Sequence, residues 1–375
     1  MIVDLDASPD PTVDGIIREH FISGKTMKFG LFGGAKVQRG ASTADSHGYR
    51  TFIDYVKTAE ALGYESLFMV EHHFTGQGQV SASLNMLSYL AACTTRMRLG
   101  TAVVVLPWHN PVLIAEQVAT LDVLSGGRVD FGVGKGYRDN EFDGFCVPME
   151  EATERFDEAI EVIRKAWTSP GRFSHQGKRW RFHDVVVEPE PVQRPHPPFW
   201  MGAGSADSIR RAARDGYSLL LDQVADIDEV IEKVRIYHEA CIAAGRPYSP
   251  MQVGLTRALH IVRNDEERSK ALATRKEVLK TISSIARPLK PKAPGSYADP
   301  NIAGDDAALL GTPAEIIAKL RRLQAGGVEY ILLVGYGDLN QSLREFAAEI
   351  MPHVQDTAGT NPGEHPIDQL RTAVG

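Results

Sequence analysis

Short apolar runs alternate with longer amphipathic stretches from Met27 onward, and this alternation constrains the fold more than any other feature of the chain. It is the pattern of repeated strand and helix units and of a parallel sheet. Eight runs are predicted to be strands: Lys28–Phe32, Ser66–Val70, Arg98–Leu106, Arg128–Val133, Pro198–Met201, Ser218–Asp222, Val253–Val262 and Tyr330–Val334. An open, doubly wound sheet would show the same alternation. Eight units in about 330 residues are, however, the number that closes a barrel, so we predict an α/β protein with a (β/α)8 TIM barrel.

Amphipathic segments with apolar residues three and four positions apart separate these strands. We predict a helix over each of the following: Gly48–Leu62, Val112–Leu124, Glu151–Trp167, Ala206–Arg214, Asp226–Ala244 and Glu315–Gln324. Two segments interrupt the alternation. Pro170–Pro197 is an insertion before the fifth strand, where we expect a small hairpin, and Arg287–Gly311 is a long loop of low apolar content after the seventh. Loops of this length in a compact domain are often lids.

These boundaries divide the 375-residue chain into three parts. Residues 1–26 are expected to form a polar N-terminal arm, residues 27–354 the barrel as a single domain, and residues 355–375 a C-terminal tail.

The charge balance and the cysteine content exclude several classes of protein. The chain carries 41 Lys and Arg against 48 Asp and Glu, a formal net charge of -7. Such a field repels nucleic acid and acidic membrane surfaces, so we expect neither as a partner. Cys93, Cys146 and Cys241 form no Cys-x-x-Cys pair, which argues against a disulfide framework and a structural zinc site. No membrane span and no signal peptide is apparent, so we expect a cytoplasmic protein.

The active site of such a barrel lies at the carboxyl ends of its strands, which directs attention to the residues that follow each strand. The fifth strand is followed by Gly202, Ala203, Gly204 and Ser205, which lead directly into a predicted helix. Backbone N–H groups at the helix start, with the hydroxyls of Ser205 and Ser208, form a receptor for a phosphate. Lys135, after the fourth strand, adds a cation on the same rim. In the simpler alternative, Ser205 only caps the helix and Lys135 is a solvated lysine.

Histidines follow the second strand in the sequence Glu71-His72-His73-Phe74. Because successive side chains of a strand point to opposite sides, only one of His72 and His73 can face the barrel axis. A hydrolytic metal centre therefore lacks ligands, and we predict no metal. A single inward histidine is suited to proton transfer or to the stabilisation of a developing anion.

Several motifs occur in the same order as in one known family. They are Met27-Lys28-Phe29-Gly30, Glu71-His72-His73-Phe74-Thr75, Gly100-Thr101-Ala102 with Val105-Leu106-Pro107 and Pro111, Gly127-Arg128 with Phe131-Gly132, and Gly311-Thr312-Pro313. The ordered set resembles the bacterial luciferase-like flavin-dependent monooxygenases over about residues 27–354. The resemblance implies a barrel that binds reduced flavin mononucleotide (FMN), with its phosphate on the loop after the fifth strand.

The resemblance also assigns roles to individual residues. Gly202, Ala203, Gly204, Ser205 and Ser208 fall on the phosphate loop, and Lys135 stands where the family has an arginine. Ala102-Val103 resembles a pair joined by a non-prolyl cis peptide beneath the flavin ring, with Val103 in place of the family's alanine. Phe32 and Gln223 fall near positions that contact the ring, and Arg138 replaces a tyrosine there.

The same resemblance makes His72 the catalytic residue at the reactive edge of the flavin. It implies that reduced FMN from a separate NAD(P)H-dependent flavin reductase reacts with O2 to give a peroxide at carbon 4a, which oxygenates a small organic substrate. It further implies a homodimer. Trp108, His109 and Asn110 are expected to line the substrate pocket.

Three alternatives to this function stay open at this point. The chain could be a deazaflavin-dependent oxidoreductase of the same fold, a flavin-binding protein without catalysis, or a metal-dependent barrel hydrolase.

Overall fold

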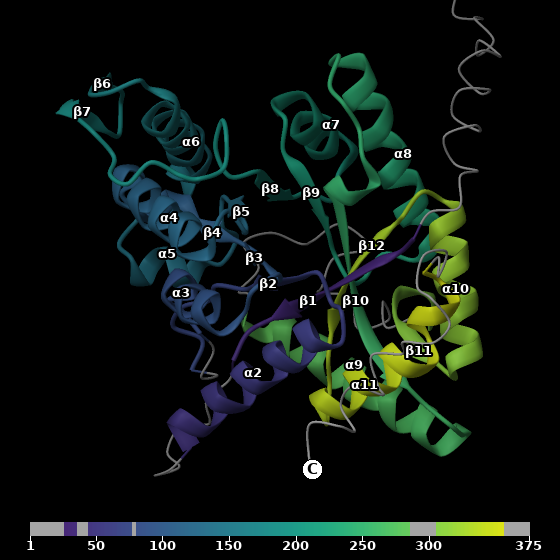
Figure 1. Cartoon of the computed structure of the whole chain (residues 1–375). Helices are drawn as coiled ribbons and strands as arrows, with labels where there is room; N and C mark the ends of the chain where they lie inside the picture. Colours follow the sequence, from purple (N-terminus) through teal and green to yellow (C-terminus); the bar gives the residue numbers. More distant parts are fainter. Residues whose placement is uncertain (1–25, 36–43, 77–79, 286–304, 356–375) are drawn as a thin grey trace, which may run out of the picture.

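A closed ring of eight parallel strands forms the centre of the molecule, as the alternation predicts (Figure 1). The computed structural model describes residues 26–35, 44–76, 80–285 and 305–355, so the predicted arm and tail lie outside the described residues except for Thr26 and Gln355. The ring consists of β1 (Lys28–Gly33), β2 (Ser66–Met69), β3 (Arg98–Thr101), β5 (Val129–Gly134), β8 (Phe199–Gly202), β9 (Ser218–Leu221), β10 (Val253–Ile261) and β12 (Tyr330–Val334). β1 pairs with both β2 and β12, which closes the barrel.

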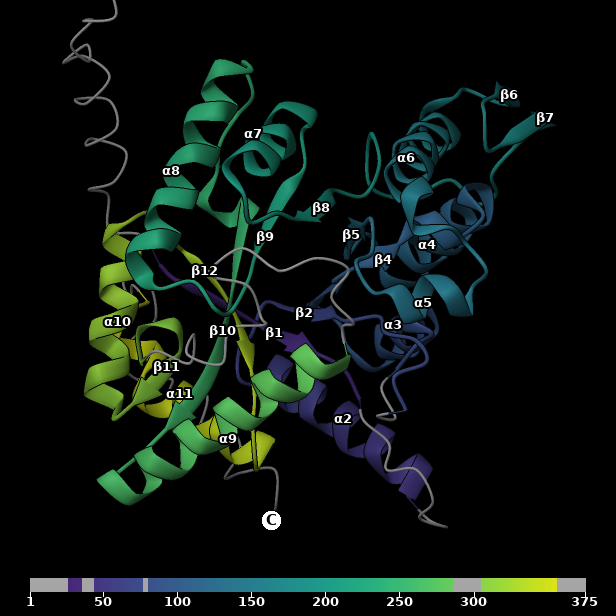
Figure 2. The same ribbon diagram turned by 180° about the vertical axis from the view of Figure 1, so that it is seen from behind.

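Helices surround this ring on its outer face (Figures 1 and 2). They are α2 (Ala44–Ala61), α3 (Ser83–Cys93), α4 (Pro111–Ser125), α5 (Asp139–Gly144), α6 (Ala152–Thr168), α7 (Ala206–Asp215), α8 (Ile227–Ala243), α9 (Asp265–Ile285), α10 (Pro313–Ala325) and α11 (Leu339–Glu349). Glycine in the left-handed conformation ends α4 at Gly126 and α7 at Gly216, because this conformation is sterically costly for other residues. None of the helices in the described ranges is long and apolar enough to cross a membrane.

The prediction of one continuous third strand over Arg98–Leu106 is wrong in the middle of that range. β3 ends at Thr101, and the chain continues as β4 (Val104–Val105) and a single 3₁₀ turn over Leu106–Trp108. The ladder with β5 breaks between them, at the Ala102–Val103 peptide bond, which is cis as the resemblance implies. A side-chain hydrogen bond spans the gap, since the Thr101 hydroxyl donates to the Gly132 carbonyl oxygen at 2.7 Å.

The insertion before the fifth barrel strand contains the expected hairpin. β6 (Phe173–Gln176) and β7 (Arg181–Val185) pair antiparallel and project at the edge of the molecule beside α6 (Figures 1 and 2). The insertion is tied to the barrel by Gln193, whose backbone N–H donates to Asp122 Oδ2 at 2.9 Å and whose side chain donates to the Val129 carbonyl oxygen at 2.8 Å.

The prediction of a loop over Arg287–Gly311 is wrong at the C-terminal end of that range. Residues 286–304, and with them most of the predicted lid, lie outside the described residues. The remainder forms a 3₁₀ turn over Asp305–Ala307 and the short strand β11 (Leu309–Gly311), which pairs in parallel with β10. Leu309 and Leu310 are buried, and β10 extends past its pairing with β9, so the apolar side chains and this C-terminal part of β10 favour a strand here.

Large side chains fill the inside of the barrel. Phe68, Trp200, Leu220, Tyr330 and Leu332 form this buried cluster, which we call the barrel plug. Glycines face it from the strands in between. A Cβ atom at Gly100 would lie 2.5 Å from the Phe68 ring, and one at Gly254 would lie 3.0 Å from the Leu332 side chain. The interior is therefore packed to the point where these two positions accept no larger residue without movement of a neighbour.

An ion pair lies inside the barrel next to the plug. Arg98 donates from Nε and Nη2 to the two carboxylate oxygens of Asp130, each at 2.7 Å. Trp200 Nε1 also donates to Asp130 Oδ1 at 3.1 Å, so the buried carboxylate has three donors. Such bidentate pairing compensates the loss of hydration that burial of a carboxylate entails.

The Gly132→Ala variant tests the close packing between β3 and β5. A Cβ atom at Gly132 would overlap the backbone carbonyl oxygen of Thr101, which cannot move without displacing the strand. We expect the free energy of unfolding in urea to fall by ~3 kcal/mol or more. Gly171→Ala is the matched control, because a Cβ atom at Gly171 meets no atom of the described residues within 4 Å. A loss within about 0.5 kcal/mol in both variants would contradict the packing argument.

Candidate active site

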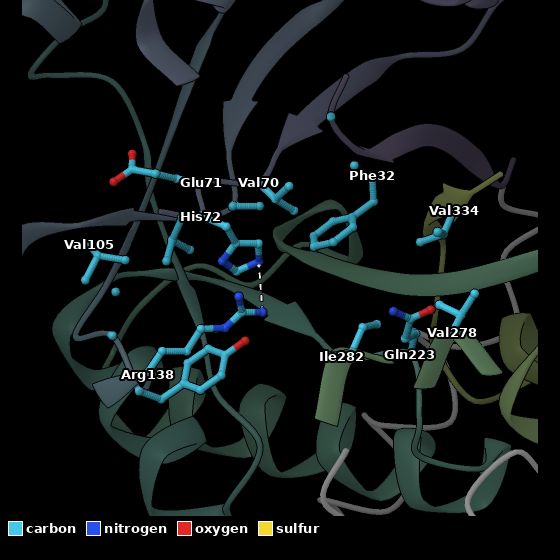
Figure 3. Close-up of a pocket in the computed structure, with 18 of the residues that line it drawn as sticks. Phe32, Val70, Glu71, His72, Val105, Arg138, Gln223, Val278, Ile282 and Val334 are labelled. Carbon is cyan, nitrogen blue, oxygen red and sulfur yellow. Dashed lines mark hydrogen bonds between the residues drawn. The ribbon is translucent and has the colours of Figure 1, made fainter. Parts of the chain in front are cut away.

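A cavity of about 820 Å³ opens at the carboxyl ends of the barrel strands. Its walls come from the ends of β1, β2, β5, β8 and β12, from the Ala102–Val105 segment, and from helices α2, α7 and α9. The labelled side chains in Figure 3 include Phe32, Val70, Val105, Val278 and Ile282, which give the cavity a largely apolar wall. A cavity of this size and character is typical of small-molecule and cofactor sites.

The structure places eight of the sequence-predicted site residues on the cavity wall. They are Phe32, His72, Ala102, Val103, Lys135, Gly202, Ser208 and Gln223. Ala203, Gly204 and Ser205 form the turn between β8 and α7, between two wall residues, but are not themselves part of the wall. Phe32, Ala102 and Val103 pack on the barrel plug, so the plug supports this part of the cavity.

The turn after β8 is held by its own serines. Ser205 is the N-cap of α7: its hydroxyl accepts from the Ser208 backbone N–H, and the Ser208 hydroxyl accepts from the Ser205 N–H at 3.1 Å. This reciprocal arrangement is a capping box, and it fixes the start of the helix beside the cavity. Ser205 thus has the capping role that the simpler alternative assigns to it.

Two cations border the same rim of the cavity. Lys135 is half-buried, with Nζ 3.5 Å from the Thr153 hydroxyl and 5.8 Å from the centre of the Phe156 ring. Arg211, one turn after Ser208 on α7, also lines the cavity, and its Nη2 donates to Asp157 Oδ1 at 2.6 Å. Arg211 is not among the site residues predicted from the sequence. Its spacing of three residues from Ser208, which places both on one helix face, is the signal that could have found it.

His72 lies between a carboxylate and a guanidinium at the cavity wall. Its Nδ1 lies 3.3 Å from Glu141 Oε1. Its Nε2 lies 3.4 Å from Arg138 Nη2, the contact drawn as a dashed line in Figure 3. A guanidinium can only donate, so Nε2 accepts this hydrogen bond and Nδ1 carries the proton that faces Glu141. Glu141 and Arg138 are buried, each 3% exposed. Arg138 stands where the resemblance has a ring-contacting tyrosine, whereas no motif in the sequence indicates a role for Glu141.

His73 is not part of the cavity wall, so of the two histidines only His72 lines the cavity; both follow the end of β2 at Met69. The His73 ring packs edge to face on Phe145, with centroids 4.7 Å apart, and its Nε2 lies 3.2 Å from Glu71 Oε1. His109 Nε2 lies 3.2 Å from the same carboxylate oxygen, and the Ser83 hydroxyl donates to the other oxygen at 3.1 Å. In the described part of the chain, no group of three or more His, Cys, Asp or Glu side chains is arranged to hold a metal ion.

The three residues predicted to line a substrate pocket have other surroundings. Trp108 stacks on Phe145, with ring centroids 5.1 Å apart, and Asn110 caps α4 by accepting from the Val112 N–H at 3.0 Å. His109 contacts Glu71, as described above. Within the described residues, none of the three lines the cavity. Trp108 and His109 instead contact the segment that carries His72, at His73 and Glu71.

Comparison with known proteins identifies the family of the chain. A family model for luciferase-like monooxygenases matches residues 27–330. The chain belongs to the luciferase-like monooxygenase family. The match extends over most of the chain and confirms the resemblance that the ordered motifs indicate.

Two relatives show how this chain compares with curated proteins. The FMNH(2)-dependent dimethylsulfone monooxygenase of Pseudomonas putida is 28% identical over 331 residues, which is 81% of this chain and 88% of that protein. The uncharacterized protein y4vJ of Sinorhizobium fredii is 31% identical over 224 residues, 60% of this chain and 64% of that protein. The chain spans only 49% to 64% of the length of y4vJ and two further curated relatives.

Two solved structures share the barrel of this chain. The monooxygenase RslO1 from Streptomyces bottropensis superimposes with a TM-score of 0.76 at 25% identity, covering 87% of this chain and 99% of that chain. An F420-dependent secondary alcohol dehydrogenase superimposes with a TM-score of 0.70 at 17% identity, covering 88% and 100%. At that identity the second likeness shows the fold alone.

The buried carboxylate of Glu71 leads to a prediction about stability against pH. Burial raises its pKa, but the hydrogen bonds from His109 and His73 outweigh burial and lower the pKa from 4.5 to about 2. The ionised carboxylate therefore contributes stability above about pH 4.5, and the contribution is lost as the pH falls toward 2. In Glu71→Gln, we expect a loss on the order of 3 kcal/mol at pH 7 that shrinks steadily below pH 4.5.

Urea unfolding between pH 7 and pH 2.5 measures this difference. Glu266→Gln is the control, because Glu266 is an exposed residue at the start of α9. A constant difference between wild type and Glu71→Gln over the whole pH range would contradict the prediction.

Proposed function

We propose that this chain is a monooxygenase that uses reduced FMN and O2 to oxygenate a small organic substrate. The observation that carries the proposal is one cavity with two chemically distinct ends: a rim with Ser208, Lys135 and Arg211, and an apolar interior beside His72. A phosphate matches the first end and an aromatic ring system matches the second. The Pseudomonas putida relative is an FMNH(2)-dependent dimethylsulfone monooxygenase, which supports the choice of reduced FMN as the cofactor.

The residues of the cavity fit FMN. Gln223 is buried, and its Oε1 has no hydrogen-bond partner within the described ranges, so it has an acceptor available for an N–H group of a flavin ring. Phe32, Ala102 and Val103 present an apolar surface on which the ring would lie. Ser208, Lys135 and the turn formed by Gly202–Ser205 would hold the phosphate.

Reduced FMN, when bound, supplies the electrons that activate O2. The chain's residues bind and orient the reactants. His72 holds a proton at Nδ1 against Glu141, while Arg138 donates to its Nε2, so the imidazole is fixed in orientation at the cavity wall. An imidazole fixed in this way is suited to transfer or stabilise a proton near the reacting groups.

We propose that a separate NAD(P)H-dependent flavin reductase supplies the reduced FMN. The loop Gly202–Ser205 is followed by Asp207 where a dinucleotide fingerprint would have its third glycine, so this loop does not match a nicotinamide site.

We also propose a homodimer through α3 and α4. These helices pack against each other and expose apolar side chains: Tyr89, Leu113 and Leu124 are 57%, 50% and 61% exposed. Exposed apolar groups on neighbouring helices favour an interface. Sedimentation equilibrium measures the state directly, and a monomer at micromolar concentration would contradict the dimer.

Titration with FMN and with riboflavin tests the cofactor assignment. In Lys135→Met, we expect FMN to bind about five- to tenfold more weakly, because a cation beside the phosphate is lost, while riboflavin, which lacks the phosphate, binds as in the wild type. Lys178→Met is the control, since Lys178 lies on the exposed hairpin and pairs with Glu154. Tighter binding of a deazaflavin cofactor than of FMN by the wild type would contradict the proposal.

The His72→Gln variant tests catalysis. We expect product formation from an organic substrate panel with reduced FMN and O2 to fall by about 100-fold, because the proton at Nδ1 is lost, while FMN affinity changes less than threefold. His183→Gln, on the exposed strand β7, is the matched control. O2 consumption and hydrogen peroxide release are measured in parallel. Flavin binding without turnover in the wild type across the panel would favour a flavin-binding protein without catalysis.

A further inference from the structure

The guanidinium of Arg138 has donors that the protein itself leaves unused. Arg138 directly precedes α5 and lines the cavity, with its charged end beside His72 (Figure 3). The residue is 3% exposed. Nη2 contacts His72 Nε2 at 3.4 Å, but Nε and Nη1 have no hydrogen-bond partner within the described part of the chain.

The nearby carboxylate does not satisfy these donors. Glu141 Oε1 lies 3.8 Å from Arg138 Nη1, beyond hydrogen-bond distance. The same oxygen already accepts from the His73 backbone N–H at 2.9 Å and faces His72 Nδ1 at 3.3 Å. Burying a charged donor without an acceptor is costly, so an acceptor is expected from a molecule in the cavity.

The surroundings of Arg138 define the chemistry of that molecule. A guanidinium presents parallel N–H groups that match the two oxygens of a carboxylate, and its charge favours an anion. The cavity that Arg138 lines also has apolar residues, among them Val70, Val105 and Phe32. A ligand that matches both features has an anionic oxygen group on an apolar body.

We propose that Arg138 is a specificity-determining residue that receives a carboxylate, or a similar oxyanion, of an apolar organic substrate. The inference rests on the proposed function, because it places that substrate in the flavin cavity next to His72. The proposed receptor for the FMN phosphate uses other residues of the cavity wall: Ser208 and Arg211 on α7, and Lys135 after β5. Arg138 is therefore available to the substrate.

Calorimetric titration with benzoate and benzamide tests this assignment. The two probes have nearly the same shape, and only benzoate carries a charge. We expect the FMN-saturated wild type to bind benzoate about tenfold or more tightly than benzamide. In Arg138→Gln, this preference should fall to within twofold, and in Arg138→Lys it should be intermediate, because the charge is kept and the planar pair of donors is lost.

Two controls make the result specific. Arg194→Gln removes an exposed arginine of the insertion that pairs with Glu190, and it should keep the full preference for benzoate. Thermal unfolding followed by circular dichroism checks that each variant is folded. Should Arg138→Gln fail to fold, Arg138→Lys and the wild-type preference decide the outcome.

The possible failures are distinguishable. Equal binding of the two probes by the wild type, no binding of benzoate, or an undiminished preference in a folded Arg138→Gln would overturn the assignment while the FMN proposal stands. A tenfold loss of FMN affinity in Arg138→Gln with an unchanged benzoate preference would assign the guanidinium to the cofactor instead. If the wild type does not bind FMN, the proposed function fails, and the same titrations on the chain without FMN decide the anion assignment.

Discussion

The close packing of large side chains against glycines inside the barrel is the constraint on which the rest of the structure depends. The barrel plug comes from four strands, and glycines on the strands between them leave the room that its rings require. Phe68 and Trp200 meet edge to face with centroids 5.0 Å apart, directly where Gly100 approaches. A parallel barrel closes only if its interior is filled without overlap, so this alternation of large and small residues sets the ring of eight strands.

The filled interior also determines where chemistry can occur. Because the plug occupies the middle of the barrel, space for a ligand remains at the carboxyl ends of the strands, above Phe32, Ala102 and Val103. The side chains that leave those strand ends then converge on one cavity. His72 from the end of β2 meets Arg138 from the end of β5 in this way, although 66 residues separate them.

The sequence predicted the regular part of this arrangement well. The barrel strands and the hairpin of the insertion follow from local periodicity, which depends on neighbouring residues alone. The choice of His72 over His73 came from the resemblance to the family, because β2 ends at Met69 and strand alternation does not extend to either histidine. The prediction failed where contacts with a segment distant in the sequence determine the local structure. β11 pairs with the part of β10 that extends past β9. The predicted strand Arg98–Leu106 is interrupted after Thr101, whose hydroxyl donates to the Gly132 carbonyl oxygen. Trp108 follows the break and packs on Phe145 rather than on the cavity.

The amino-acid sequence by itself determined the strand and helix alternation and the family motifs, His72 among them, because each depends on the identity and spacing of nearby residues. Only the tertiary structure decided that Glu141 and Arg138 flank that histidine, that Arg211 joins the rim with Lys135, and that α9 completes the cavity wall. These contacts depend on the closure of the barrel, which brings distant segments within a few ångströms of one another, and no local pattern records that distance.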